Sequence, residues 1–129
     1  MTRSEVREIL MQIMYEMDAA NTMDAESAEK LCSERLTGKN VERGALILKN
    51  TIDNIEDIDK VIDDNSKTWK TGRMPKVDLA IMRLIIGEIR YGDDLPKAVA
   101  VNEAINLAKK YSTERSSKFI HGVLGAVIN

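Results

Sequence analysis

The sequence predicts an all-α fold of seven helices, and three observations support this class. Apolar residues recur at steps of three and four along most of the 129-residue chain. Two prolines and seven glycines are too few for a turn-rich β architecture. Only 4% of residues are aromatic, so aliphatic side chains and methionine must build the core. At this length we expect one domain over residues 1–129, or two small subdomains that share a core.

Four helices are predicted before residue 65. The first begins with a capping box over residues 2–5, and the second covers residues 25–36 until Thr37 and Gly38 stop it. The third begins near Asn40 as its N-cap, and a short fourth helix follows; whether these two are separate stays open. The residues expected to face inward are Val6, Ile9, Leu10, Ile13, Met14 and Met17; Ala28, Leu31, Cys32 and Leu36; Val41, Ala45, Leu48, Ile52 and Ile55; Ile58, Val61 and Ile62.

Residues 65–75 break the helical pattern and are interpreted as a hinge between two halves, with Trp69 packed against both sides. Pro75 opens a fifth helix that Gly92 closes, and Pro96 opens a sixth. Ser112 or Thr113 caps the seventh. The inward residues are Val77, Ala80, Ile81, Leu84, Ile85 and Ile89; Ala98, Val101, Ile105 and Ala108; Ile120, Val123, Leu124, Val127 and Ile128.

Charge is distributed unevenly. The formal net charge is −2, yet residues 109–121 carry four basic side chains against one acidic one. Residues 53–64 carry six acidic side chains against one lysine. A polyanion should therefore avoid the acidic segment and meet the basic one, which also holds Tyr111 and Phe119. The alternative is that these aromatic side chains belong to the core and the charges form a solvated rim.

The sequence offers no positive sign of catalysis. His121 is the only histidine, and no Cys/His cluster or nucleophile motif accompanies it. We therefore expect no enzyme activity, no cofactor and no metal. A single cysteine, Cys32, excludes an internal disulfide, and no apolar run is long enough for a membrane span. Without a signal-peptide pattern, the expected location is the cytoplasm.

Residues 69–124 resemble the NusB family of bacterial transcription antitermination factors. The segment matches in order and spacing across nearly half of the chain. A weaker similarity to the family's arginine-rich first helix involves Arg3, Arg7, Gln12 and Tyr15, and residues 20–64 match only in length and helical character. The matching residues are Trp69 and Arg73, residues 78–84, Glu88 and Ile89, Pro96, residues 101–104, residues 107–109, Tyr111 and Ser112, residues 117–119, and residues 122–124.

This resemblance implies both a fold and a function. The fold would have two helical subdomains, three helices then four, divided here at about residues 1–66 and 67–129. NusB proteins pair with NusE, a protein of the small ribosomal subunit, and the pair binds the boxA element of ribosomal RNA leader transcripts. With other Nus factors and RNA polymerase, they let transcription pass terminators and aid rRNA maturation. The expected partners are therefore single-stranded boxA-type RNA, NusE, other Nus factors and RNA polymerase.

The resemblance also implies site residues. Arg3 and Arg7 would contact phosphate, while Tyr15 and Phe119 would stack on bases or flank them. The remaining RNA-binding candidates lie around the turn into the last helix: Lys110, Arg115, Ser116, Ser117 and Lys118. The NusE-facing candidates are Asp78 and Arg83. Core positions for Tyr15 and Phe119, and surface ion pairs for Arg73 and Arg83, are the alternatives.

Several departures and alternatives stay open. The first helix carries Glu5, Glu8 and Glu16 against two arginines, so its RNA affinity without a partner should be weak. Arg115 stands where the family can have an acidic residue, and His121 stands where asparagine is usual. A helical protein-interaction module with an incidental basic patch is one alternative, and a stand-alone rRNA maturation factor is another. NusB-like domains also occur fused to RNA cytosine methyltransferases, but no cofactor-binding βαβ pattern occurs here. Homodimerisation is undecided.

Overall fold

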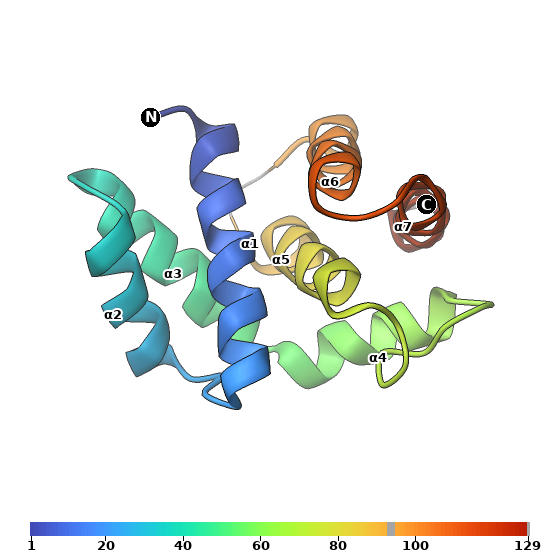
Figure 1. Cartoon of the computed structure of the whole chain (residues 1–129), viewed down its shortest axis with the longest axis horizontal. Coiled ribbons are helices and arrows are strands. Elements are labelled where there is room, and N and C mark those ends of the chain that lie inside the picture. The colour runs from blue at the N-terminus through green and yellow to red at the C-terminus, as the bar shows by residue number, and fades with distance from the viewer. Residues whose placement is uncertain (93–94, 129) are drawn as a thin grey trace.

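The computed structural model describes residues 1–92 and 95–128, and this part of the chain contains seven α-helices and no strand (Figure 1). The all-α fold predicted from the sequence is confirmed. Each predicted helix is present, with ends close to those expected. The helices are α1 (Arg3–Ala20), α2 (Ala25–Arg35), α3 (Lys39–Asp53), α4 (Ile55–Asn65), α5 (Lys76–Tyr91), α6 (Lys97–Tyr111) and α7 (Glu114–Ile128).

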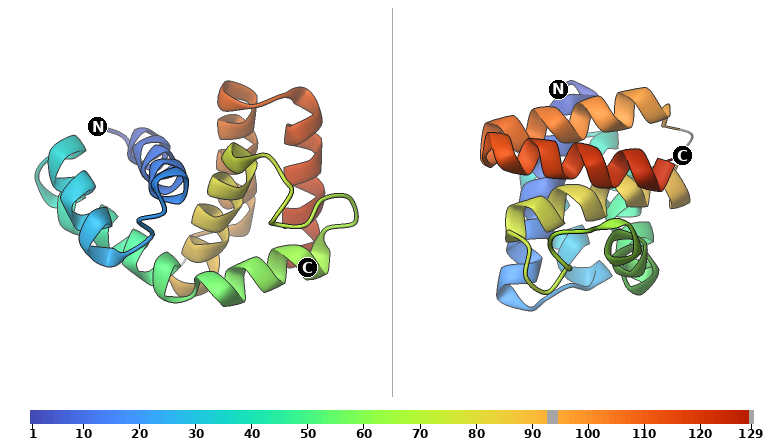
Figure 2. Two further views of the ribbon diagram at one scale, coloured as in Figure 1. Left: turned by 60° about the horizontal axis from the view of Figure 1, so that its bottom comes forward. Right: turned by 90° about the vertical axis from the view of Figure 1, so that its right-hand side faces the viewer.

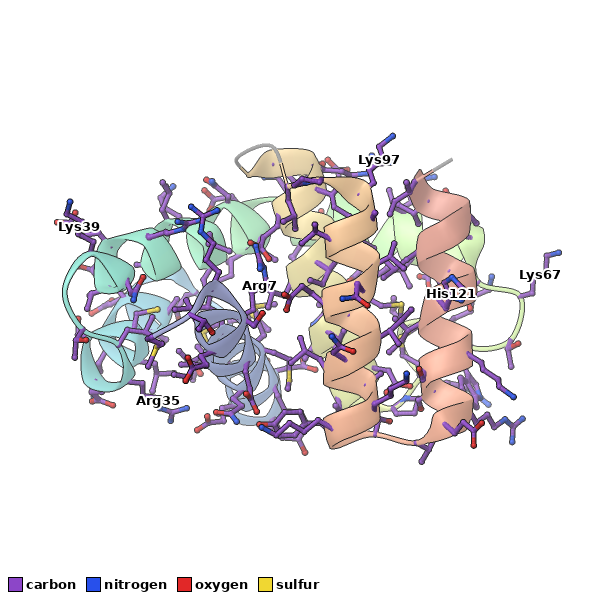
Figure 3. The ribbon with its side chains drawn as sticks, turned by 90° about the horizontal axis from the view of Figure 1, so that it is seen from above. Arg7, Arg35, Lys39, Lys67, Lys97 and His121 are labelled. Atoms are coloured by element: carbon purple, nitrogen blue, oxygen red, sulfur yellow. The ribbon has the colours of Figure 1, made fainter. Side chains whose placement is uncertain are left out.

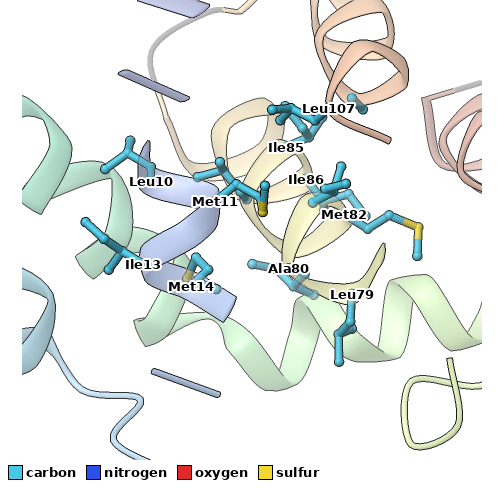
Figure 4. Packing of buried hydrophobic residues seen from close by; sticks show 14 of the residues in the cluster. Leu10, Met11, Ile13, Met14, Leu79, Ala80, Met82, Ile85, Ile86 and Leu107 are labelled. Atoms are coloured by element: carbon cyan, nitrogen blue, oxygen red, sulfur yellow. The ribbon is translucent and has the colours of Figure 1, made fainter. Parts of the chain in front are cut away.

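Helix α5 is the centre of the molecule. Ten of its sixteen residues are buried, because apolar side chains occupy most of its positions. It packs against α1, α3, α4, α6 and α7. In Figure 4, Leu10 and Met14 of α1 and Leu107 of α6 lie around the α5 side chains. The result is one continuous hydrophobic core, built from aliphatic side chains and methionine as expected.

The other helices form two groups on either side of α5. Helices α1, α2 and α3 pack together, whereas α4 packs mainly against α5 and α7. Figure 2 shows α6 and α7 side by side, connected by a short turn. These contacts group three helices before Asn54 and four after it. The proposed subdomain boundary near residue 66 stays a prediction.

The helix ends agree with the sequence at most positions. The predicted capping box is present: the Glu5 amide donates to Thr2 Oγ1 at 3.1 Å, and the Thr2 amide donates to Glu5 Oε1 at 2.8 Å. The prediction of Asn40 as N-cap was wrong. Helix α3 begins at Lys39, and Gly38 precedes it with φ of 59°, a backbone conformation that glycine adopts without strain. Asn54 separates α3 from α4.

The α4–α5 loop, residues 66–75, is tied to the end of α4. The Thr71 amide donates to Asp63 Oδ1 at 2.7 Å, and the Lys70 ammonium donates to the Asp63 carbonyl at 2.8 Å. The Ser66 hydroxyl donates to the carbonyl of Trp69, whose half-buried ring packs against the core. The loop therefore holds Trp69 in a defined place.

Candidate nucleic-acid interface

The turn between α6 and α7 gathers exposed cations, as the sequence predicted. Lys109 and Lys110 end α6, and Arg115 and Lys118 lie on the first turns of α7, all four exposed. The Thr113 hydroxyl accepts from the Ser116 amide at 3.0 Å and so caps α7. This cap settles the choice between Ser112 and Thr113, and it fixes where the α7 cations project.

A polar seam joins α1 to this turn. Glu8 of α1 accepts hydrogen bonds from the Lys110 ammonium and the Tyr111 hydroxyl, and Gln12 Nε2 donates to the Tyr111 hydroxyl oxygen at 2.7 Å. The hydrogen bond from Lys110, followed by that from Tyr111, lowers the pKa of the Glu8 carboxyl. The same carboxylate raises the pKa of Tyr111. These contacts place the exposed side of α1 next to the α6–α7 turn.

Arg7 does not lie on this surface. Its side chain is buried between α1 and the helices α5 and α6 (Figure 3). Its Nε donates to Glu88 Oε2 at 2.9 Å, and its Nη1 lies 3.8 Å from Glu103 Oε1. Arg7 is 6% exposed and has two carboxylates beside its guanidinium, so a phosphate cannot reach it. The expected phosphate contact is corrected to a buried ion pair.

Arg3 and Tyr15 are the α1 candidates that reach solvent. Arg3 is exposed near the start of α1, and Tyr15 retains 38% of its accessible surface. Tyr15 borders a mostly apolar hollow between α1, α5 and α6, whose other lining residues are Met11, Gln12, Glu16, Val77 and Tyr111. An aromatic ring at the edge of such a hollow is available to a base or to a partner side chain.

Phe119 is half-buried and packs on the ring of Trp69. The two ring centroids are 5.0 Å apart and the planes meet at 74°, an edge-to-face arrangement. On the same helix, Ser116 and Ser117 are buried, with 3% and 7% exposure. Their side chains face the interior, which corrects the expectation that both serines contact RNA. Lys118 remains exposed, 4.0 Å from Glu114.

Neither predicted partner-binding residue offers a free side chain. Asp78 is fully buried: its Oδ1 accepts from the Ser112 hydroxyl at 2.9 Å, and its Oδ2 has no hydrogen-bond partner among the described residues. Arg83 donates two hydrogen bonds to Asp59, at 2.8 and 2.7 Å, and lies 3.7 Å from Asp18. Asp78 therefore acts inside the fold, whereas the half-buried Arg83 takes part in ion pairs that tie α5 to α4 and α1.

Sequence reasoning missed one cationic residue near α1. Arg43 of α3 is exposed and lines a hollow together with Arg3, Arg7 and Glu88. No helical periodicity or motif points to it, because its proximity to α1 depends on how α3 packs. Within the described residues, no group of three or more His, Cys, Asp or Glu side chains is arranged to hold a metal ion. No helix in this part of the chain has the length and apolar character needed to cross a membrane.

The fold and the exposed turn define an all-helical protein with a cationic and aromatic surface at one end. The chain belongs to the NusB family, whose family model matches residues 4–129. It is similar to the transcription antitermination protein NusB of Finegoldia magna, with 40% identity over 99% of this chain and 94% of that protein. The NusB protein of a Thermoanaerobacter species is 39% identical over 99% of this chain and 91% of its own length. The resemblance seen in the sequence is thereby confirmed.

Solved structures share this fold. The structure of T. maritima NusB matches with a TM-score of 0.88 and 26% identity, over 98% of this chain and 90% of that chain. A protein chain from the crystal structure of a plectonemic RNA supercoil matches with a TM-score of 0.84 and 24% identity, over 98% of this chain and 93% of that chain. The second likeness shows a shared fold alone.

Proposed function

We propose that this protein is a transcription antitermination factor. It binds boxA RNA of ribosomal RNA leader transcripts together with the ribosomal protein NusE, and so promotes processive transcription and maturation of rRNA. The observation that carries the proposal is the exposed cationic turn between α6 and α7, on a net acidic chain whose relatives are named transcription antitermination proteins. The protein acts by binding rather than catalysis, in the cytoplasm, with other Nus factors and RNA polymerase.

The proposed RNA surface joins α1 to the α6–α7 turn. Proteins recognise single-stranded RNA with cations for its phosphates and aromatic faces for its unstacked bases, at about 1–3 kcal/mol per stacked base. The seam of Glu8 and Gln12 with Tyr111 brings these two regions together. The exposed or half-exposed residues that form the surface are Arg3, Tyr15, Lys110, Arg115, Lys118 and Phe119.

The buried candidates support this surface from beneath. Arg7 fixes α1 to α5 through Glu88. The Ser116 backbone amide donates to the Thr113 hydroxyl that caps α7. Replacing the Arg7 side chain would alter RNA binding only by disturbing the helices that carry the surface. The supporting and contacting roles are therefore separable by measuring stability and affinity on the same variants.

We place the NusE contact at the apolar hollow beside α5. Asp78 is buried, but its neighbour Val77 lines this hollow with Met11 and Tyr15. The hollow adjoins the proposed RNA surface through Tyr15 and Tyr111. A partner bound there would add its own RNA contacts beside those of α1. Such help is needed because α1 has more glutamates than arginines and should bind RNA weakly alone.

The test is fluorescence anisotropy with labelled boxA RNA and a scrambled RNA of equal composition, with and without purified NusE, across a salt series. Preference for boxA that strengthens with NusE supports the proposal. Equal and steeply salt-dependent binding to both RNAs would reduce the surface to generic electrostatics. No binding under any condition would reject the RNA function and favour a protein-interaction module.

Two variants locate the surface. Phe119→Ala and Lys118→Glu should weaken boxA binding while helicity stays that of the parent. The matched control is Lys39→Glu, because Lys39 is an exposed lysine at the opposite end of the molecule from α7 (Figure 3). If the Lys118 and Lys39 variants lose affinity equally, the effect is one of net charge and the proposed surface is wrong.

A further inference from the structure

A second cationic and aromatic surface lies on the α4–α5 loop, beside the start of α7. We call it the loop platform and define it as Lys67, Trp69, Lys70, Arg73 and Arg115. Residues 66–73 contain three basic side chains and no acidic one. All four cations of the platform are exposed and the Trp69 ring is half-exposed. Figure 3 shows Lys67 projecting outward beside α7.

The Arg115 guanidinium contacts an aromatic ring, whereas three other arginines form hydrogen bonds to carboxylates. The Arg115 guanidinium lies over the ring of Trp69, 5.5 Å from the centroid. By contrast, a carboxylate accepts hydrogen bonds from each of Arg7, Arg35 and Arg83. A carboxylate occupies guanidinium N–H donors, whereas an aromatic face orients the group and leaves its in-plane donors available. Arg115 is thus pre-positioned to bind an anion through its free edge.

Trp69 is itself fixed in place. Its carbonyl accepts from the Ser66 hydroxyl, and its ring packs edge-to-face with Phe119. The two acidic groups at the end of α4, beside the loop, are already occupied. Asp63 accepts from Thr71, and Asp64 pairs with Lys60 at 2.8 Å. These carboxylates therefore compete little with an incoming polyanion for the platform cations.

We propose that the loop platform binds a phosphate-bearing stretch of single-stranded RNA that continues from the α6–α7 turn. Arg115 belongs to both surfaces and joins them. Trp69 is a positioning residue that holds the Arg115 guanidinium toward a phosphate, while Lys67 and Arg73 supply further charge. The inference rests on the proposed RNA-binding function and deepens it: nucleotides flanking the boxA element would run along the α4–α5 loop.

The first experiment compares two double variants that each remove two exposed charges. Lys67→Ala/Arg73→Ala removes platform cations, and Lys30→Ala/Lys39→Ala removes cations of α2 and α3. The RNA is boxA with flanking nucleotides on both sides. The platform variant should bind about tenfold more weakly, and the slope of log affinity against log salt should fall by roughly 1.4, about 0.7 for each lost phosphate contact. The control should bind within twofold of the parent.

Fluorescence of Trp69 gives an independent readout, because it is the only tryptophan in the chain. RNA that reaches the platform should change its emission with the same apparent Kd as the anisotropy signal. The parent protein serves for this measurement. An RNA limited to the boxA core should bind with a smaller emission change than the flanked RNA.

The positioning role of Trp69 is tested by coupling. Trp69→Leu keeps the Arg115 charge and loses only its orientation, so it should weaken binding less than Arg115→Ala does. In the Arg115→Ala background, Trp69→Leu should have little further effect. Arg115→Lys keeps the charge but loses the planar group, so it should recover less than half of the lost affinity. Thermal melts show whether each variant is folded at the assay temperature.

The outcomes separate the two proposals. If the parent prefers boxA but neither Trp69 emission nor the platform double variant responds, the loop platform is wrong and the antitermination function stands. If the parent binds boxA RNA no more tightly than scrambled RNA, the proposed antitermination function itself is rejected, and with it the inference that rests on it. If a NusE titration without RNA changes Trp69 emission and RNA does not, the platform is a protein-binding surface and the inference is overturned.

Discussion

Replacing Gly87 of α5 with alanine should destabilise the folded protein, because the added methyl group has no room beside α3. A Cβ at Gly87 would lie 2.2 Å from Thr51 Oγ1, 3.0 Å from Thr51 Cβ and 3.1 Å from Thr51 Cγ2. Rotating the Thr51 side chain moves the two branch atoms but not its Cβ. The crossing of α3 and α5 must therefore open for Gly87→Ala to fit.

The magnitude follows from two opposing effects. Overpacking a close-packed interior costs about 1–3 kcal/mol, and the fixed Thr51 Cβ favours the upper end. Alanine in place of glycine within a helix returns up to about 1 kcal/mol. We expect Gly87→Ala to lower the free energy of unfolding by about 2 kcal/mol, measured by urea denaturation with far-UV circular dichroism. The midpoint should fall while the m-value stays that of the parent.

The chain provides matched controls and a rescue. At Gly122 and Gly125 of α7, an added Cβ meets no atom within 4 Å, so alanine there should stabilise the protein by up to about 1 kcal/mol. In a Thr51→Ala background the cost of Gly87→Ala should fall by at least about 1 kcal/mol, because both branch atoms are gone. If Gly87→Ala is as stable as Gly122→Ala, the close approach of α3 and α5 is wrong.

Three further substitutions or reactions test other contacts. Glu88→Gln leaves the buried Arg7 guanidinium poorly compensated, and urea denaturation should show a loss of about 3 kcal/mol; a change under 0.5 kcal/mol would refute the buried pair. Because the pKa of Glu8 is lowered in the folded state, its contribution is present above its ordinary pKa near 4.5 and is lost as the pH falls below it. Glu8→Gln should thus be less stable than the parent by roughly 1 kcal/mol at pH 6, and the difference should shrink as the pH falls from 4.5 through the lowered pKa of Glu8; a pH-independent difference would contradict this. Burial raises the pKa of the Cys32 thiol to about 11, so Ellman's reagent should label it slowly in the native protein and rapidly in urea; equal rates would show an exposed thiol.

The helices could be predicted from the sequence because their signals are local. The capping box at Thr2 and the apolar stripe of α5 each depend on residues within a few positions of one another. The start of α3 was misplaced because both Gly38 and Asn40 suit a helix boundary. Only the positive φ of Gly38 decides between them, and periodicity does not report it.

The site could be predicted less well because its contacts are long-range. Arg7 was expected at the RNA surface from the resemblance to the family's first helix, yet its side chain pairs with Glu88, which lies 81 positions away in the sequence. Asp78 and Ser112 are 34 positions apart. No sequence pattern around Trp69 indicates its contact with Arg115, because the two residues meet only when α4 packs against α7. Exposed lysines at the α6–α7 turn were predicted correctly because capping and net charge are readable locally.

The central position of α5 has a consequence for synthesis on the ribosome. Helices α1 to α3 are complete at Asp53, but the helix that covers their apolar face ends at Tyr91. Between these points 38 more residues must be added, which takes roughly 2–8 s at bacterial elongation rates of about 5–20 residues per second. During that interval Leu10 and Met14 have no native partner on α5, so the nascent chain exposes an apolar surface to which chaperones can bind.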